Sequence, residues 1–192
     1  MIAIIKYNAG NISSVQNAFN RLGVESIITD NHEEILSADR IIFPGVGEAS
    51  SAMRHLKANG LDALIQNCTK PFLGICLGLQ LMCENSEEGD VECLKIFNTK
   101  VKKFPKNEKV PHMGWNDFKN VDGLLFNGIE ATSNMYYVHS YFAEVCENTV
   151  ATCDYILPFS AAMQKDNFFA TQFHPEKSAE EGERLLKNFL EL

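Results

Sequence analysis

The sequence predicts an α/β protein with a mainly parallel central sheet, flanked by helices, and with an antiparallel β portion in the second half. In the first half, apolar strand-like runs alternate with segments of helical periodicity, which is typical of a parallel sheet covered on both faces. After Glu84 the strand-like segments become short and closely spaced, which favours antiparallel hairpins. A chain of 192 residues can bury one good core, so we expect a single domain over residues 1–192.

Strands and helices alternate through the first half of the chain. Short apolar runs predict the strands, and apolar residues three or four positions apart predict the helices. Asn11 is a suitable N-cap and Gly23 a suitable C-cap for the helix between them. The expected strands cover residues 2–5, 24–29, 40–43 and 72–75, and the expected helices cover residues 12–22, 33–38, 49–58 and 61–68.

Short strands dominate the second half, and one helix ends the chain. Ser178 is a suitable N-cap for this last helix. The apolar face of the helix carries Leu185, Leu186, Phe189 and Leu190. The expected strands before it cover residues 93–97, 110–118, 135–142, 150–154, 160–164 and 168–173.

The composition excludes several classes of protein. The formal net charge is -8, and the one basic cluster, residues 100–106, is interrupted by Phe104 and Pro105, so we expect no nucleic-acid partner. No apolar run has membrane-spanning length, and the first residues resemble a strand more than a signal peptide. We therefore expect no membrane partner and a cytoplasmic location.

The six cysteines form no C-x-x-C pair, which argues against zinc sites and redox motifs. In a reducing compartment they should be free thiols. We expect no metal and no cofactor.

One cysteine has a special position. Cys76 follows the apolar strand 72–75, stands between Gly74 and Gly78, and precedes a segment with a helical apolar face. A nucleophile between two glycines at a strand-to-helix turn is the arrangement of a nucleophile elbow, and the start of a helix favours the thiolate. The pattern alone leaves a second interpretation open, because a cysteine that ends an apolar strand is more often packed than catalytic.

A partner for this nucleophile could come from the end of the last expected strand. His174 follows that strand, and Glu176 stands two residues further on, so in an extended segment both side chains point the same way. Glu176 could then fix the tautomer of His174, whose other nitrogen would take the proton of Cys76. The alternative is an ordinary pair of surface residues.

Backbone amides could stabilise an oxyanion beside Cys76. The Leu77 amide would face the nucleophile, and the glycine loop Pro44-Gly45-Val46-Gly47 follows a strand whose carboxyl end lies at the same edge of the sheet. An ordinary strand-to-helix turn explains this loop equally well.

Taken together, the segments G-I-C-L-G-L-Q at 74–80 and Q-F-H-P-E at 172–176 resemble class I (triad) glutamine amidotransferases. A closer resemblance, to the glutaminase subunits of imidazole glycerol phosphate synthase, extends over the whole chain. It rests on Y-N-A-G-N at 7–11, P-G-V-G at 44–47, S-E-E-G at 86–89, P-H-M-G-W-N at 111–116 and Y-V-H-S-Y at 137–141.

The resemblance implies the three-layer fold of that family and a role for each site residue. Cys76 would attack the carboxamide of glutamine, form a thioester and release ammonia. His174 would act as general base and then as general acid, and Glu176 would orient it. The oxyanion would lie between the Leu77 amide and an amide of the loop at Val46 and Gly47.

The same resemblance implies a glutamine-binding site. Gln80 and Glu88 match positions that hold the amino-acid end of glutamine, and a carboxylate suits the substrate ammonium group. Gly45, Ser140 and Tyr141 would contribute mainly backbone contacts. Without the resemblance, Gln80 would be interpreted as a helix surface residue and Glu88 as part of a solvated turn.

A partner subunit is also implied, because the chain has no evident site for an acceptor of ammonia. The family's partner is a (β/α)₈-barrel cyclase of HisF type, with which the chain would form a heterodimer in histidine biosynthesis. Asn11, Trp115, Tyr136 and Lys177 resemble partner-facing positions.

Three alternatives remain open from the sequence. A paralogous glutaminase could serve another synthase, such as one that aminates a nucleotide sugar. A cysteine peptidase of related fold fits less well with Gln80 and Glu88, which suit a free amino acid. A catalytically silent binding subunit fits less well with an intact Cys76, His174 and Glu176.

Overall fold

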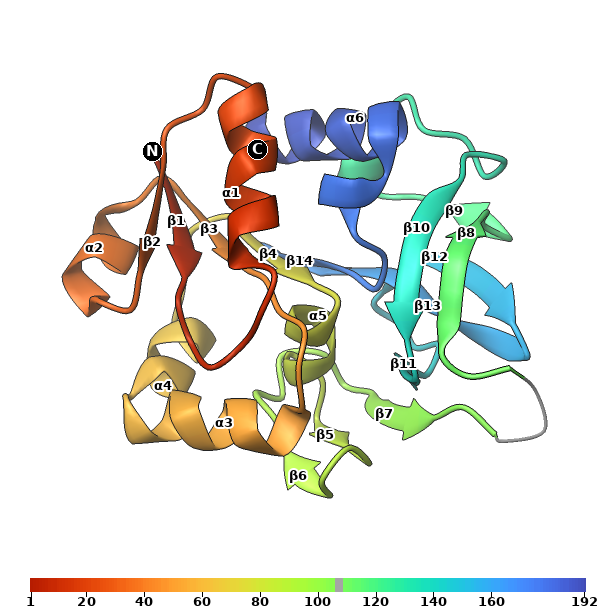
Figure 1. The fold of residues 1–192 in the computed structure, drawn as a ribbon, viewed down its shortest axis with the longest axis horizontal. Helices are drawn as coiled ribbons and strands as arrows, with labels where there is room; N and C mark the ends of the chain where they lie inside the picture. The colour runs from red at the N-terminus through yellow and green to blue at the C-terminus, as the bar shows by residue number, and fades with distance from the viewer. Residues whose placement is uncertain (106–108) are drawn as a thin grey trace.

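The computed structural model describes residues 1–105 and 109–192, so Lys106 of the basic cluster lies outside the described residues. A large mixed sheet crosses the molecule between two groups of helices (Figure 1). Its strand order is β2-β1-β3-β4-β14-β13-β12-β9. The α/β class and the flanking helices expected from the sequence are therefore confirmed.

The helices and strands have the following bounds. The helices are α1 (Ile12–Arg21), α2 (His32–Ser37), α3 (Ala49–Ala58), α4 (Leu61–Gln66), α5 (Leu77–Leu81) and α6 (Ala179–Leu190), with short 3-10 helices η1 (Leu124–Phe126) and η2 (Pro175–Lys177). The strands of the large sheet are β1 (Ile2–Ile5), β2 (Ser26–Thr29), β3 (Arg40–Phe43), β4 (Phe72–Ile75), β9 (Asn120–Val121), β12 (Thr149–Tyr155), β13 (Leu157–Lys165) and β14 (Phe168–Thr171).

The large sheet is parallel in one half and antiparallel in the other. Neighbours from β2 through β1, β3 and β4 to β14 all pair in parallel. From β14 through β13 and β12 to β9 every pair is antiparallel. Strand β14 joins the two halves, because it pairs with β4 on one side and with β13 on the other.

The alternation of side chains along β1 explains why helices cover both faces of the sheet. Ala3 and Ile5 pack into a core with residues of α3 and α4, whereas Ile2 and Ile4 pack into a second core with residues of α1 and α6. Successive side chains of a strand point to opposite faces. Figure 1 shows these two helix pairs on opposite sides of the sheet.

Two smaller sheets flank the antiparallel half. One is a two-stranded ribbon of β8 (His112–Asn116) and β10 (Met135–His139), which lies in front of β12 and β13 in Figure 1. The other has the order β11-β7-β5-β6 and lies near α3 and α5. Its strands are β5 (Asn85–Ser86), β6 (Val91–Glu92), β7 (Lys100–Lys103) and β11 (Tyr141–Ala143).

The expected strand at 93–97 is wrong. Its amides bond to carbonyls at the end of α5: Leu94 N–H donates to Leu81 O and Ile96 N–H to Met82 O, at 2.8 and 2.9 Å. Lys95 has a φ of 56°, which no strand allows. The segment therefore follows the helix end, although its apolar residues are buried as they would be in a strand.

The single strand expected at 135–142 is interrupted. The chain leaves the ribbon after β10, passes Ser140, and pairs with β7 as β11. Strand β7 was not expected, because its four residues carry three lysines.

The two expected N-cap side chains do not cap their helices. Asn11 and Ser178 occupy the N-cap positions of α1 and α6, but neither side chain bonds to its helix. The Ser178 hydroxyl instead donates to His174 O and accepts from Tyr136 N–H, at 2.7 and 3.0 Å. Gly23 closes α1 as expected, but it stands one residue beyond the C-cap, Leu22, and has a left-handed φ of 73°.

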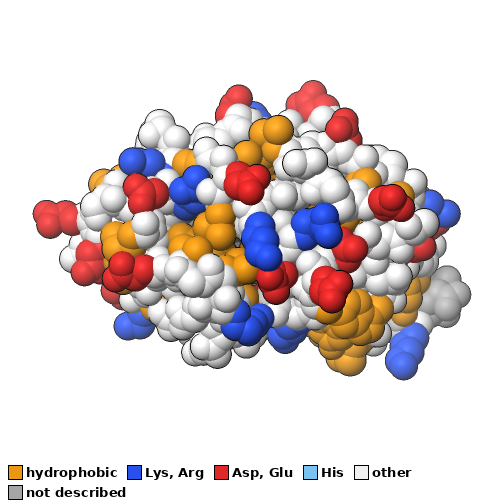
Figure 2. Space-filling view, turned by 90° about the horizontal axis from the view of Figure 1, so that it is seen from above, with side chains coloured by type: hydrophobic (Ala, Val, Ile, Leu, Met, Phe, Trp, Pro, Cys, Tyr) orange, Lys and Arg blue, Asp and Glu red, His pale blue; other side chains and the backbone are white. Residues whose placement is uncertain are grey.

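The surface shown in Figure 2 mixes both signs of charge, and hydrophobic side chains gather at its lower right. Over residues 1–105 and 109–192, no helix combines the length and the apolar character that crossing a membrane requires.

Candidate active site

The turn between β4 and α5 places Cys76 at the carboxyl end of the parallel sheet. Cys76 has a φ of 54°, a strained value for a residue with a side chain. The neighbouring glycines allow the turn to pack: a Cβ on Gly78 would lie 2.0 Å from Phe43 O, and a Cβ on Gly74 would lie 2.6 Å from the sulfur of Met82. The elbow expected from the sequence therefore has a steric reason at each glycine.

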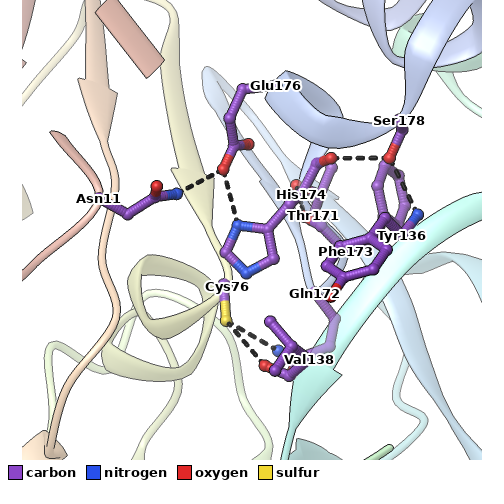
Figure 3. Close-up of polar contacts among 10 residues, drawn as sticks. All are labelled: Asn11, Cys76, Tyr136, Val138, Thr171, Gln172, Phe173, His174, Glu176 and Ser178. Carbon is purple, nitrogen blue, oxygen red and sulfur yellow. Dashed lines mark hydrogen bonds and ion pairs between the residues drawn. The ribbon is translucent and has the colours of Figure 1, made fainter. Parts of the chain in front are cut away.

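The parallel pairing of β4 with β14 brings the two distant motifs together. Ile75 pairs with Thr171, and Cys76 N–H donates to Thr171 O at 2.7 Å. The chain then continues to His174, whose ring lies beside Cys76 in Figure 3. Residues nearly a hundred positions apart in the sequence thus meet at one sheet edge.

His174 and Glu176 form a buried pair. His174 Nδ1 and Glu176 Oε1 are 2.8 Å apart, and the two side chains are 1% and 0% exposed. The other ring nitrogen, Nε2, has no hydrogen-bond partner among the described residues. Figure 3 shows this nitrogen on the side of the ring that faces Cys76, where it could exchange a proton with the sulfur.

The geometric reason for the pair differs from the expected one. His174 is extended, but Pro175–Lys177 form the 3-10 helix η2. The carboxylate returns toward the ring through this turn and not through an extended i, i+2 arrangement. Burial of the pair also excludes the interpretation as ordinary surface residues.

Asn11 supports Glu176 from the opposite side. Its Nδ2 group donates to Glu176 Oε1 at 2.6 Å, so one oxygen accepts bonds from both Asn11 and His174 (Figure 3). This contact was not predicted, because Asn11 was expected to face a partner. The left-handed conformation of Asn11, with a φ of 69°, directs it here, and a turn residue before a helix gives no sequence signal for such a bond.

Electrostatics favour a protonated His174. Burial alone lowers the pKa of His174, but the nearby Cys76 sulfur, followed by the hydrogen bond and charge of Glu176, outweighs burial and raises this pKa to about 10. A proton on His174 at neutral pH would stabilise a negative sulfur on Cys76 and leave an acid ready for a leaving group.

A cleft of about 250 Å³ opens onto Cys76. It collects most of the predicted site residues from the parallel half, the elbow and the ribbon. The predicted residues that line it are Val46, Gly47, Cys76, Leu77, Gln80, Glu88, Ser140 and Tyr141, and Pro111, Val138 and His139 join them. His174, Glu176 and Gly45 are not part of its wall.

The residues expected to contact glutamine differ in which of their hydrogen-bonding groups remain free. Both donors of the Gln80 amide are engaged, by Tyr141 O at 2.8 Å and Gln172 Oε1 at 3.0 Å. Glu88 accepts a bond from Ala49 N–H at 3.0 Å and remains partly exposed. Burial raises the pKa of Glu88.

The carbonyls of Ser140 and Tyr141, two further expected contact residues, are already engaged. Tyr141 O accepts from His139 Nδ1 as well as from Gln80, and Ser140 O accepts from Phe104 N–H.

The loop that should supply the oxyanion hole is closed. Leu77 N–H donates to Gly45 O at 3.2 Å, so this amide does not point freely into the cleft. The neighbouring carbonyls are also held: Val46 O accepts from Gly10 N–H at 2.9 Å, and Pro44 O accepts from the Tyr7 hydroxyl at 2.6 Å. An oxyanion role for Leu77 and the loop therefore requires a change of this arrangement.

The expected partner-facing residues other than Asn11 lie together on the surface. The rings of Trp115 and Tyr136 are 6.0 Å apart, and Lys177 Nζ lies 5.9 Å from the centre of the Tyr136 ring. Trp115 is 54% exposed. Trp115 and Lys177 line a second cleft of about 460 Å³, whose wall also includes Glu176.

No metal site is visible: within the described part of the chain, no three His, Cys, Asp or Glu side chains could together hold a metal ion.

A family model for "Glutamine amidotransferase class-I" matches residues 3–192. The chain belongs to this family. As a class I glutamine amidotransferase it is a glutaminase enzyme, and its sheet has the fold of known members. A solved structure called a glutamine amidotransferase superposes with a TM-score of 0.77 at 19% identity, covering 99% of this chain and 97% of the other.

Curated relatives are much closer in sequence. The chain is 57% identical over 194 residues to a Bacteroides thetaiotaomicron protein named imidazole glycerol phosphate synthase subunit HisH, with 100% of this chain and 99% of that protein covered. A Pasteurella multocida protein of the same name is 50% identical, with coverage of 99% and 97%.

Proposed function

We propose that this amidotransferase is the glutaminase subunit of an imidazole glycerol phosphate synthase. It would hydrolyse glutamine to glutamate and supply ammonia to a (β/α)₈-barrel cyclase subunit of HisF type. Full-length relatives of that name support the assignment. The observation that carries the glutaminase chemistry is the buried His174–Glu176 pair beside Cys76. Cys76 itself lines a cleft suited to a small amino acid.

The reaction would begin as His174 takes the proton of Cys76, a transfer that the raised pKa of His174 favours. The sulfur attacks the carboxamide carbon, and the carbonyl oxygen becomes an oxyanion. His174 then gives its proton to the nitrogen as the carbon–nitrogen bond breaks, which releases ammonia and leaves a thioester. His174 next takes a proton from water, and the hydroxide formed hydrolyses the thioester to glutamate and restores the sulfur.

Two side chains of the cleft suit the amino-acid end of glutamine. Glu88 offers a partly exposed carboxylate for the ammonium group. Gln80 has both amide hydrogens engaged inside the protein, so its remaining group is the carbonyl oxygen, which accepts hydrogen bonds from a substrate donor.

A heterodimer with the cyclase is part of the proposal. Trp115, Tyr136 and Lys177 form an aromatic and basic cluster on the surface beside Glu176. Trp and Tyr are enriched at the centres of interfaces. The chain would be a slow glutaminase alone, because the Leu77 amide is engaged by Gly45 O. We place the complex in the cytoplasm, where six unpaired cysteines would stay reduced.

The test mixes the purified chain with a HisF-type cyclase and its nucleotide substrate, and measures product formation with glutamine as the only nitrogen source. We expect product, and glutamine hydrolysis well above that of the chain alone. A Cys76→Ala variant should still bind the cyclase but yield no glutamine-dependent product, while added ammonia should still support the cyclase.

Three results would contradict the proposal. Full turnover without the cyclase would remove the need for a partner, and appreciable hydrolysis by Cys76→Ala would remove the nucleophile. A chain that hydrolyses glutamine but supports only another synthase, such as one that aminates a nucleotide sugar, would favour the paralogue.

A further inference from the structure

We propose that Gln172 holds the sulfur of Cys76 through a side-chain N–H whose direction Gln80 fixes, and that two buried histidines of the β8–β10 ribbon hold in place the Tyr141 carbonyl to which Gln80 is bonded. The inference rests on the proposed function, since it concerns the same nucleophile. Gln172 Nε2 lies 3.7 Å from Cys76 Sγ, and the Gln172 side chain is fully buried (Figure 3). Such a donor binds a thiolate more strongly than a thiol, because hydrogen bonds to charged acceptors are the stronger ones.

Cys76 Sγ has a second polar neighbour, Val138 O, at 3.9 Å. This carbonyl can only accept, so it suits the S–H group of the thiol and offers nothing to the thiolate. The Gln172 amide is therefore the contact on the ribbon side of Cys76 that favours the charged form. Its effect depends on which end of the amide faces the sulfur.

Gln80 determines that orientation. Its Nε2 donates to Tyr141 O at 2.8 Å and to Gln172 Oε1 at 3.0 Å. Because a backbone carbonyl only accepts, Gln80 must direct its NH₂ group toward Tyr141, and the same group then requires an acceptor on Gln172. The oxygen of the Gln172 amide thus faces Gln80, and its NH₂ group is left for Cys76.

The Tyr141 carbonyl also anchors a pair of histidines. His139 Nδ1 lies 2.8 Å from Tyr141 O and must carry the hydrogen, so His139 Nε2 is an acceptor. That nitrogen lies 3.0 Å from His112 Nδ1, which must therefore donate. His112 Nε2 is then an acceptor for Asn116 Nδ2 at 3.4 Å. Each ring has one possible tautomer, and all donors point from Asn116 toward Tyr141.

The surroundings keep both histidines neutral, as this chain of bonds requires. The His112 ring stacks on Tyr155 at 4.0 Å and on Tyr137 at 4.8 Å, and no carboxylate bonds to either histidine within the described residues. Burial lowers the pKa of His112 to about 4 and that of His139 to about 3. A neutral imidazole offers one donor and one acceptor, so the sequence of bonds stays directional.

The chain of bonds links Cys76 to a strand with an exposed outer face. His112 and Asn116 belong to β8, whose Met113 and Trp115 are 61% and 54% exposed. The β8 side chains that point inward complete the buried chain, while those that point outward meet the solvent. Gln172 therefore contacts the reacting sulfur directly, and His139 and His112 act as positioning residues through the Tyr141 carbonyl, which also anchors Gln80.

The first test replaces Gln172 by Met, which has similar length but no N–H. The rate of Cys76 alkylation by iodoacetamide is followed by mass spectrometry of the Cys76 peptide between pH 5 and 10, with the chain alone. We expect alkylation at pH 7 to be about tenfold slower and its pH midpoint to rise, since a bond to the charged form is lost. The turnover number for glutamine should fall by a similar factor, with KM unchanged.

Other titratable groups near Cys76 stay constant in this comparison. His174 faces it from the end of β14, and Tyr7 lies near it at the end of β1. The matched control is Gln66→Met, which removes an amide bonded to Leu94 O on the exposed side of α4 and should leave the alkylation profile unchanged.

The second test separates positioning from packing at His139. Replacement by Leu removes the bond to Tyr141 O and should slow Cys76 alkylation about threefold. Replacement by Asn can restore an N–H near the position of Nδ1, and should recover most of the rate. If Gln172→Met does not fold, as judged by circular dichroism, Gln172→Glu replaces it, and its acceptor beside the sulfur should slow alkylation further.

Unchanged alkylation in a folded Gln172 variant would overturn the proposal, as would equal rates for the Leu and Asn variants of His139. Because alkylation needs neither glutamine nor the cyclase, it does not depend on the proposed function. That function is assessed separately from glutamine turnover by the unaltered chain.

Discussion

Two groups of residues flank Cys76, and only one of them is already arranged for catalysis. On one side, His174 is bonded to Glu176 and carries an elevated pKa, so the groups for proton transfer are in place. On the other side, Leu77 N–H is bonded to Gly45 O, and the loop that should hold an oxyanion is closed. The difference indicates that a resting enzyme of this kind can keep its nucleophile activated while it withholds transition-state stabilisation.

The physical reason is that one side of Cys76 is formed by side chains and the other by backbone groups. The proton-transfer side consists of side chains fixed by a buried turn and by parallel pairing with β4, and it needs no backbone change. The oxyanion side consists of backbone groups in a glycine loop, where Gly47 has a φ of 144°. Reorienting such a loop exchanges one backbone hydrogen bond for another, which costs little compared with dismantling a buried ion pair.

The largest expected effect comes from His174 itself. A His174→Asn variant should lose about 10,000-fold in cyclase-stimulated glutamine turnover, because both proton transfers depend on one ring. Loss of less than tenfold would break the comparison, since the supposedly complete side would then contribute little. Turnover with saturating cyclase is the measurement, and ammonia-dependent cyclase activity in the same complex controls for assembly.

Substitutions of Glu176 and Asn11 should lower turnover less than that of His174, and by different factors. Glu176→Gln removes the charge that orients His174 and should cost about 1,000-fold in turnover. Asn11→Ala removes one neutral donor to the same carboxylate and should cost about tenfold or less. Both are measured with and without the cyclase. If Asn11→Ala lowers turnover only in the presence of the cyclase, Asn11 has the partner-facing role expected from the sequence.

Most strands and helices of the parallel half could be predicted from the sequence, because local patterns of residues define them. The run Ile2–Ile5 and the glycines around Cys76 are such patterns, and resemblance to a family linked the elbow to His174 across about half of the chain. Segment 93–97 shows where local signals mislead: its apolar residues are buried, but its amides bond to the end of α5. Burial does not by itself distinguish a strand from a packed loop.

The parts of the site that could not be predicted depend on how backbone and side-chain groups are oriented, and not on which residues are present. No sequence pattern shows that Leu77 N–H bonds to Gly45 O, because both a free and an engaged amide have the same residues. The contact of Asn11 with Glu176 depends on one left-handed residue, and the position of Gln172 depends on a neighbour ninety-two residues away, Gln80. Three-dimensional proximity was the missing information in each case.

The stability of the fold should depend on pH in opposite ways through the neutral histidines, His112 and His139, and through the protonated His174. Their depressed pKa values stabilise the fold above about pH 6.5, and this contribution is lost as pH falls toward about 4 for His112 and about 3 for His139. His174 acts in the opposite direction in this range, because its raised pKa keeps it protonated in the fold while the unfolded chain takes up this proton only near pH 6.5. We expect the free energy of unfolding to fall by about 1 to 3 kcal/mol between pH 7.5 and 5.5 from this pair.

Urea unfolding at several pH values measures this loss. A His112→Gln variant keeps a donor for His139 but cannot titrate, so it should lose clearly less stability as the pH falls. His55→Gln, on the half-exposed side of α3, is the matched control and should leave the slope unchanged. Equal slopes for all three chains would show that the buried pair takes up no extra protons on unfolding.

The smallest expected effect concerns the closed side, and it has the opposite sign. Tyr7→Phe removes the hydroxyl that holds Pro44 O, which leaves a buried carbonyl unpaired and favours other arrangements of the loop. Glutamine hydrolysis by the chain alone should therefore rise about two- to fivefold, while the cyclase-stimulated rate stays constant. Tyr155→Phe, which loses a comparable bond to Lys109 O far from the loop, should change neither rate. If Tyr7→Phe lowers both rates equally, the loop is not the element that limits the resting enzyme, and the difference between the two sides of Cys76 has no kinetic consequence.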